Sequence, residues 1–130
     1  MKLTPRLPPG SDGLFGRLTA LDLSTQQFVW THRQRIPVAG STLATAGGLL
    51  FNGDLDRYFY AYDQATGDVL WRTRLNAAPE SSPITYSVNG HQYIAVVAGG
   101  GSAFGANGRG LVPELLPPAA GVTLTVFELP

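Results

Sequence analysis

The sequence predicts an all-β fold: a partial β-propeller of about two to three four-stranded antiparallel blades. Two observations predict it, a motif that recurs at the spacing of propeller blades and a series of short strands separated by turns. The 130 residues include 16 Gly and 10 Pro, which favour turns. No segment shows sustained helical periodicity. We therefore expect short strands along the chain and no sustained helix.

The recurring motif occupies residues 20–30 and 61–71, where Ala, Asp, Thr and Trp stand at identical offsets. Its tryptophans, Trp30 and Trp71, lie about 41 positions apart, within the roughly 40–45 typical of propeller blades. A tryptophan can stack on a ligand, but the repetition favours packing between blades. We expect both rings to occupy equivalent buried positions.

Each copy of the motif has the pattern of a β-hairpin. In the second copy the aromatic-rich strand 57–63 leads to a turn at Gly67, and the alternating strand 68–74 follows. Glycine takes the positive φ that such a turn requires. In the first copy Gln26 stands at the position of Gly67. The first turn is therefore either strained or of another type.

The expected strands fall into groups of two, four and three in chain order. The Asn89–Gly90 pair marks a hairpin in the last group, because this dipeptide suits a two-residue turn. The three groups comprise residues 17–23 and 27–32; residues 42–46, 48–52, 57–63 and 68–74; and residues 83–88, 92–98 and 122–128.

The remaining segments are rich in Gly and Pro. Residues 1–13 are expected to be loosely ordered and residues 14–130 to form the propeller part. Residues 99–121 read as a long loop, of the kind that is functional or disordered. Because closing a propeller takes about four to eight blades, this chain cannot close a ring alone.

Composition excludes several classes of function. Nine Lys and Arg balance nine Asp and Glu, whereas nucleic-acid binders carry a basic excess, so we expect no nucleic-acid partner. The absence of Cys excludes disulfides, thiolate metal sites and a cysteine nucleophile. No apolar run approaches the roughly 20 residues of a membrane span. The segment 1–9 lacks the apolar core of a signal peptide, so no targeting signal is expected.

The repeated motif, Ala-x-Asp-x-x-Thr-Gly-x-x-x-Trp, resembles the tryptophan-docking motif of the PQQ-dependent quinoprotein dehydrogenases. Residues 45–51 resemble that family's Thr-Ala-Gly-Gly strand pair, residues 82–100 its last blade and residues 126–130 its final strand. Residues 98–105 resemble the membrane-bound glucose/quinate dehydrogenase branch. The resemblance covers about residues 14–130 and suggests a C-terminal segment of such an enzyme.

The resemblance implies an eight-bladed propeller that oxidises an alcohol, polyol or sugar. The family holds pyrroloquinoline quinone (PQQ) with a divalent cation, usually calcium, and uses a carboxylate as general base. Electrons pass to ubiquinone or a cytochrome, and the enzymes work in the periplasm, often membrane-associated. The family's catalytic Asp and cation ligands lie upstream of this segment. We therefore expect this chain to be scaffold, inactive alone, and to bind neither PQQ nor calcium alone.

The glycine-rich stretch after the strand at 92–98 is the candidate cofactor contact. By the resemblance it would border the PQQ cavity; the alternative is a mobile glycine loop. Gly101 stands where the sugar-oxidising branch commonly has His, and Ala103 where the methanol-oxidising branch has Trp. The predicted cofactor contacts are Gly99, Gly100, Gly101, Ser102 and Phe104, and the predicted structural residues are Trp30, Trp71, Asp22, Asp63 and Gly67.

Other polar residues favour structural roles. Asp22 and Asp63 could be bases or ligands, but aspartates in turns commonly accept hydrogen bonds from backbone amides. Asn52, Asp54 and Asp56 suggest an oxygen-rich cation loop, yet they lack the Gly and Glu of the EF-hand pattern, so a turn is favoured. No catalytic or metal-binding residue is predicted; the two histidines, His32 and His91, lack neighbouring ligands.

An open stack of blades leaves faces and strand edges unpaired, at residues 17–23 and 122–128. Exposed edges favour pairing with another chain, so we expect self-association or docking with remaining propeller blades. The alternative function is a non-catalytic propeller scaffold or a binding module that oligomerises.

Overall fold

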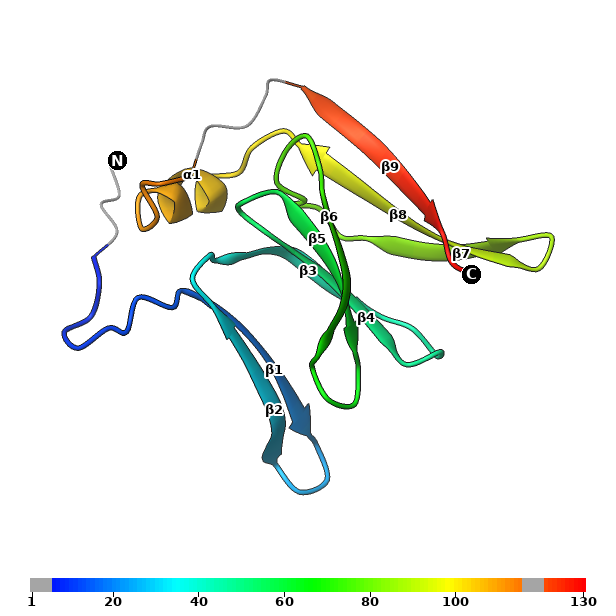
Figure 1. Cartoon of the computed structure of the whole chain (residues 1–130), viewed down its shortest axis with the longest axis horizontal. Helices are drawn as coiled ribbons and strands as arrows, with labels where there is room; N and C mark the ends of the chain where they lie inside the picture. Colours follow the sequence, from blue (N-terminus) through cyan, green and yellow to red (C-terminus); the bar gives the residue numbers. More distant parts are fainter. Residues whose placement is uncertain (1–5, 116–120) are drawn as a thin grey trace.

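The chain folds as three antiparallel sheets that follow one another in sequence order (Figure 1). The computed structural model describes residues 6–115 and 121–130. The sheets contain two, four and three strands, which confirms the predicted grouping and the all-β propeller class. We call them the first, second and third sheets: β1 (Gly16–Asp22) and β2 (Gln27–Gln34); β3 (Val38–Ala44), β4 (Leu49–Asp54), β5 (Tyr58–Asp63) and β6 (Val69–Arg74); β7 (Ile84–Val88), β8 (His91–Gly99) and β9 (Val122–Glu128).

Three hairpin turns depend on a left-handed backbone. Asn89 and Gly90 have φ of 52° and 83°, and Val88 pairs directly with His91, as in a two-residue turn. Gly67, in the β5–β6 turn, has φ of 78°. Gln26, at the equivalent place between β1 and β2, has φ of 57°. Of the two alternatives for the first turn, the structure adopts the strained one.

The prediction that residues 99–121 form a loop throughout was wrong, because a short helix lies within them. The helix α1 (Ala103–Arg109) lies within the segment expected to be a loop. Ser102 caps it by accepting a hydrogen bond from the Gly105 amide at 2.9 Å. Gly108 allows α1 to contact the β4–β5 turn, because a Cβ there would lie 2.5 Å from Cδ1 of Leu55. Seven residues with two such glycines carry too little apolar periodicity to predict a helix.

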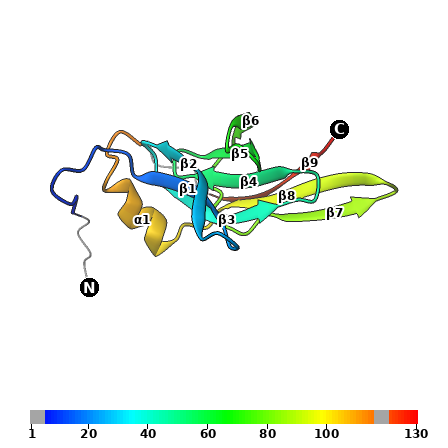
Figure 2. The ribbon, with the colours of Figure 1, turned by 90° about the horizontal axis from the view of Figure 1, so that it is seen from below.

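The view from below places α1 and the segment before β1 at one end of the molecule (Figure 2). The β7–β8 hairpin extends toward the opposite end. Residues 1–5, in the segment 1–13 that was predicted to be loosely ordered, and residues 116–120, in the predicted loop 99–121, lie outside the described residues. The domain boundary at residue 13 stays a prediction.

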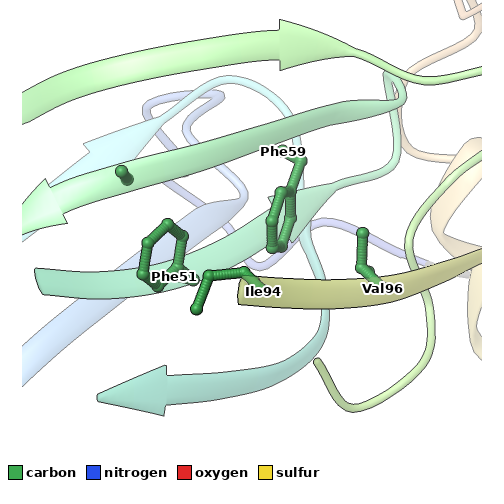
Figure 3. Close-up of a cluster of buried hydrophobic side chains, with 5 residues drawn as sticks. Phe51, Phe59, Ile94 and Val96 are labelled. Atoms are coloured by element: carbon green, nitrogen blue, oxygen red, sulfur yellow. The ribbon is translucent and has the colours of Figure 1, made fainter. Parts of the chain in front are cut away.

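The main apolar core lies between the second and third sheets (Figure 3). Because side chains alternate along a strand, one face of the second sheet points to this core and the other to the first sheet. Phe59 is 1% exposed and its ring stacks on Phe51 and Phe127, with centroids 5.9 and 6.0 Å away. The buried members of the core are Phe51, Phe59, Ala61, Ile94 and Val96.

Candidate functional site

A buried layer of polar side chains separates the first and second sheets. Asp54, at the end of β4, is 1% exposed. One of its carboxylate oxygens accepts a hydrogen bond from the Tyr60 hydroxyl at 2.7 Å, and the other accepts the Tyr58 amide at 3.1 Å. Gln34 of β2 approaches the same carboxylate at 3.5 Å. The layer thus links the two sheets through a carboxylate that has little contact with water.

Burial sets the protonation of this layer. It raises the pKa of the Asp54 carboxyl above its ordinary value, and the Tyr60 hydrogen bond opposes that rise. Burial also raises the pKa of the Tyr60 hydroxyl, and its bond to Asp54 raises it further. Burial raises the pKa of Tyr62 in the same direction. Both tyrosines therefore stay neutral, and Tyr60 remains a hydrogen-bond donor.

Two atoms of the layer have no hydrogen-bond partner among the described residues. These are the hydroxyl oxygen of Tyr62, whose residue is fully buried, and Oδ1 of Asn52. Sequence reasoning noted Asn52 and Asp54 but missed the tyrosines. Their signal was the period-2 spacing of Tyr58, Tyr60 and Tyr62, which places them on one face of β5.

We expect the Asp54→Asn substitution to remove part of the pH dependence of stability. Because the folded pKa of Asp54 lies above its unfolded value, its contribution is full below the ordinary value of 3.8 and is lost as the pH rises through the folded pKa. The wild type should lose stability relative to Asp54→Asn as the pH rises above the ordinary value of 3.8. Urea unfolding of both proteins at each pH measures this. A stability difference that does not change with pH would contradict it.

Trp30 of β2 docks on the β5–β6 turn of the second sheet. Its Nε1 donates a hydrogen bond to the Gln64 carbonyl at 3.0 Å. Its ring lies over Gly67, where a Cβ would come 2.5 Å from Cε3. Asp63 holds this turn by accepting the amides of Ala65 and Thr66 at 2.7 and 3.0 Å. One tryptophan therefore joins two sheets through a turn that needs glycine.

Trp71 of β6 stands in the equivalent place on the second sheet but is 41% exposed. Since Trp30 is only half-buried, the expectation that both rings are buried was wrong. The Trp71 ring packs edge-to-face on Phe127 at 5.1 Å. It is exposed because the third sheet, as described, has three strands, and no turn equivalent to that of Gly67 covers the ring. Beside it lies an apolar groove of about 320 Å³, lined by Leu49, Phe51, Ala61, Leu70, Trp71, Phe127, Glu128, Leu129 and Pro130.

Asp22 occupies the β1–β2 turn. Its carboxylate accepts hydrogen bonds from the Ser24 hydroxyl at 2.6 Å and the Ser24 amide at 2.7 Å. These bonds lower the pKa of Asp22. Asp22 and Asp63 thus belong to separate turns, and the structure does not bring them together or near the glycine stretch.

The glycine stretch leads from β8 into α1. Gly99, Gly100 and Gly101 all have positive φ, of 107°, 83° and 60°. Gly99 lies against the backbone of Gly121, where a Cβ would come 2.2 Å from the carbonyl oxygen. The space beside Gly101 is open. Ser102 caps α1, and the Phe104 ring is 57% exposed. The five predicted cofactor contacts therefore lie in one continuous stretch. They offer the backbone of the three glycines, the capping Ser102 and the exposed ring of Phe104.

Within residues 6–115 and 121–130, no group of three or more His, Asp or Glu side chains could hold a metal ion. Asp54 points into the buried layer, whereas Asp56 pairs with Arg74. Nδ1 of His91 pairs with Glu128 at 2.6 Å, and His32 packs edge-on against Tyr62 at 5.3 Å. Each of these aspartates and histidines therefore contacts a different partner, and they do not converge on one site.

A family model described as "Glucose/ethanol/alcohol dehydrogenase, beta-propeller domain", of the PQQ type, matches residues 2–94. The chain belongs to the PQQ-dependent dehydrogenase β-propeller family. Two features of the structure agree with membership in this quinoprotein family: Trp30 docks on the neighbouring sheet, and the sheets contain two, four and three strands in chain order.

Individual quinoproteins extend the similarity. The chain is 38% identical over 115 residues to the quinoprotein ethanol dehydrogenase of Pseudomonas putida, covering 88% of this chain and 18% of that relative. It is 36% identical over 126 residues to the quinoprotein glucose dehydrogenase of Gluconobacter oxydans (strain 621H), covering 80% of this chain and 15% of that relative. A solved europium-containing methanol dehydrogenase superposes with a TM-score of 0.78 at 31% identity, covering 92% of this chain and 24% of that one.

These quinoproteins include both alcohol and glucose dehydrogenases at similar identity. The comparisons therefore support the family and do not single out the glucose/quinate branch that residues 98–105 suggested. The chain spans less than a fifth of the length of these two curated relatives.

The residues present do not by themselves fit the family's cofactor. PQQ is a carboxylated quinone, so a pocket that holds it with calcium needs positive charge or many N–H donors and a set of oxygen ligands for the cation. The glycine stretch offers backbone amides and open space beside Gly101. The described residues contain no cluster of metal ligands to complete the site.

Among the described residues, no helix is long and apolar enough to cross a membrane.

Proposed function

We propose that this chain is the C-terminal scaffold segment of a PQQ-dependent dehydrogenase that oxidises an alcohol, polyol or sugar. The docking of Trp30 on the Gly67 turn carries the proposal, because it shows the sheets associating as successive blades. The coverage supports it: most of this chain matches a small part of much longer quinoproteins. A glucose/quinate substrate remains the specific expectation from residues 98–105.

In this function the chain's residues position blades, and the glycine stretch borders the cofactor cavity through Gly99, Gly100, Gly101, Ser102 and Phe104. PQQ, with calcium, would supply the redox chemistry when the remaining blades complete the site. Ubiquinone or a cytochrome would accept the electrons. The proposed setting is the periplasm, in association with the membrane, and the proposed partners are the remaining blades or further copies of this chain.

We expect the isolated chain to show no dehydrogenase activity with added PQQ and calcium. The reason is that its described residues offer no cluster of cation ligands, and the family's catalytic carboxylate is expected upstream of this segment. Reduction of a redox dye would be measured with glucose, quinate and ethanol in turn. Steady dye reduction by the pure chain would overturn the scaffold assignment.

A chimera tests whether this chain can serve as the scaffold segment of an active quinoprotein. The matching segment of the Pseudomonas putida quinoprotein ethanol dehydrogenase would be replaced by this chain, and PQQ-dependent ethanol oxidation would be measured. We expect the chimera to fold and retain activity, because the segment supplies blades and not the reacting groups. A folded chimera that binds no PQQ would count against the proposal. A chimera that also carries Phe59→Ala is the control, because this substitution disrupts the packing between the second and third sheets and should lower the activity.

A further inference from the structure

The helix α1 buries no apolar side chain of its own. Its two buried residues are Gly105 and Gly108, and the ring of Phe104 is 57% exposed. A helix of seven residues is too short to be stable by itself, and glycine lowers its stability further. Contacts outside the helix must therefore keep α1 in its place.

These contacts lie at the two ends of the segment that contains α1, residues 102–115, which we call the cover. At its beginning, Ser102 caps the helix. Near its end, the side chain of Val112 is fully buried, and Leu115 packs against a small apolar cluster that contains Leu55. Two side chains thus provide the apolar anchorage near the end of the cover, whereas five buried side chains form the main core.

A further anchor near the end of the cover is ionic. Both oxygens of the Glu114 carboxylate accept hydrogen bonds from Arg35, which follows β2: Nε donates to Oε1 at 2.9 Å and Nη2 to Oε2 at 3.3 Å. Arg35 is itself held, because its Nη1 donates to the Gly13 carbonyl at 3.0 Å and its guanidinium lies 4.8 Å from the centre of the Phe15 ring. A bidentate pair of this kind fixes geometry as well as charge. Arg35 therefore ties the cover to the first sheet and to the segment before it.

The Arg35–Glu114 pair matters more to the cover than to the whole molecule. Its two side chains are 43% and 53% exposed, and pairs exposed to this degree contribute little to global stability. The cover, however, has few other contacts, so this pair is a large part of what holds it. Elements with few buried apolar contacts open locally, without unfolding of the domain.

We propose that the cover opens as a unit while the three sheets stay folded, and that the Arg35–Glu114 pair is the ionic latch that keeps it closed. Arg35 is then a positioning residue, because through Glu114 and α1 it fixes the glycine stretch, which is continuous with the cover at Ser102. Opening would release the stretch that the proposed function places beside the cofactor cavity. The latch itself does not depend on that function.

Amide hydrogen exchange of the full chain, resolved by NMR, measures the opening. The reporters are the amides of Ala106, Leu111 and Val112, which donate hydrogen bonds within the cover. In the wild type these amides should be less protected than those of β5, because the cover opens without global unfolding. Arg35→Gln should speed their exchange about three- to tenfold and leave both the β5 amides and the urea midpoint unchanged.

Arg33→Gln is the matched control. Arg33 forms a similarly exposed pair with Asp12, with side chains 46% and 47% exposed, and Asp12 lies outside the cover. This substitution should leave exchange in the cover unchanged. Glu114→Gln should act like Arg35→Gln, and the double variant should show no more than either single change, because the two residues form one interaction. Arg35→Lys keeps the charge without the fork, so it should retain only part of the protection.

Salt distinguishes an ionic latch from a packing defect. Raising NaCl from about 0.05 to about 0.5 M screens exposed charges, so it should speed exchange in the cover about two- to threefold in the wild type and in Arg33→Gln, but not in Arg35→Gln. Three outcomes would overturn the proposal: a cover that exchanges only by global unfolding, equal effects of Arg33→Gln and Arg35→Gln, or a salt response that survives in Arg35→Gln.

These experiments need neither cofactor nor activity. Failure of the chimera described above would sink the scaffold assignment and leave the latch standing, whereas failure of the exchange test would sink only the latch.

Discussion

Truncation of Phe59 to alanine is expected to lower the free energy of unfolding by about 3–5 kcal/mol. The ring is 1% exposed and lies between Phe51 and Phe127, so it joins the second and third sheets. Because rings stack on both sides of it, the cavity left by the truncation cannot collapse without moving a strand. The loss should therefore lie near the upper part of the range for large core residues.

Urea unfolding followed by circular dichroism measures the loss. Phe104→Ala is the control, because Phe104 is 57% exposed on α1. That substitution should change stability by less than about 0.5 kcal/mol. Equal effects of the two substitutions would mean that the second and third sheets do not share a core in solution.

Much of this fold could be predicted because the motif repeats. The shared offsets of Trp30 and Trp71 fix the hairpins of the first and second sheets, and the Asn89–Gly90 turn fixes one in the third. Alternating side chains then determine which residues face a neighbouring sheet. These signals are local, so a single sequence contains them.

Other features depend on contacts between distant segments and could not be predicted. The helix α1 forms where Gly108 allows close approach to Leu55, a contact between segments far apart in the chain. The exposure of Trp71 depends on how many strands the third sheet has. The polar layer around Asp54 needs Tyr60 and Gln34 from different strands, and only the folded backbone brings them together.

The difference between the two copies of the motif has a physical reason. Gln26 and Gly67 both have a left-handed backbone, with φ of 57° and 78°. A tryptophan ring lies over Gly67 and leaves no room for a Cβ. Gln26 is exposed, and among the described residues no sheet precedes the first one to place a ring over it. The glycine is therefore required by the docked ring more than by the turn.

Replacement of Gly67 by alanine is accordingly expected to cost roughly 2–5 kcal/mol, the sum of left-handed strain and overpacking against Trp30. Gly90→Ala is the matched control. Gly90 has φ of 83° and open space around it, so it carries the strain without the clash and should cost roughly 1–2 kcal/mol.

A double-mutant cycle with Trp30→Ala separates the two contributions to the Gly67→Ala loss. In the Trp30→Ala background the clash disappears, because the ring that would meet the new Cβ is gone. The Gly67→Ala loss should then fall to that of Gly90→Ala, roughly 1–2 kcal/mol, and chemical denaturation of the four proteins measures it. If the Gly67→Ala loss is the same with and without the Trp30 ring, then Trp30 does not dock on this turn, and the first two sheets are not joined as successive blades.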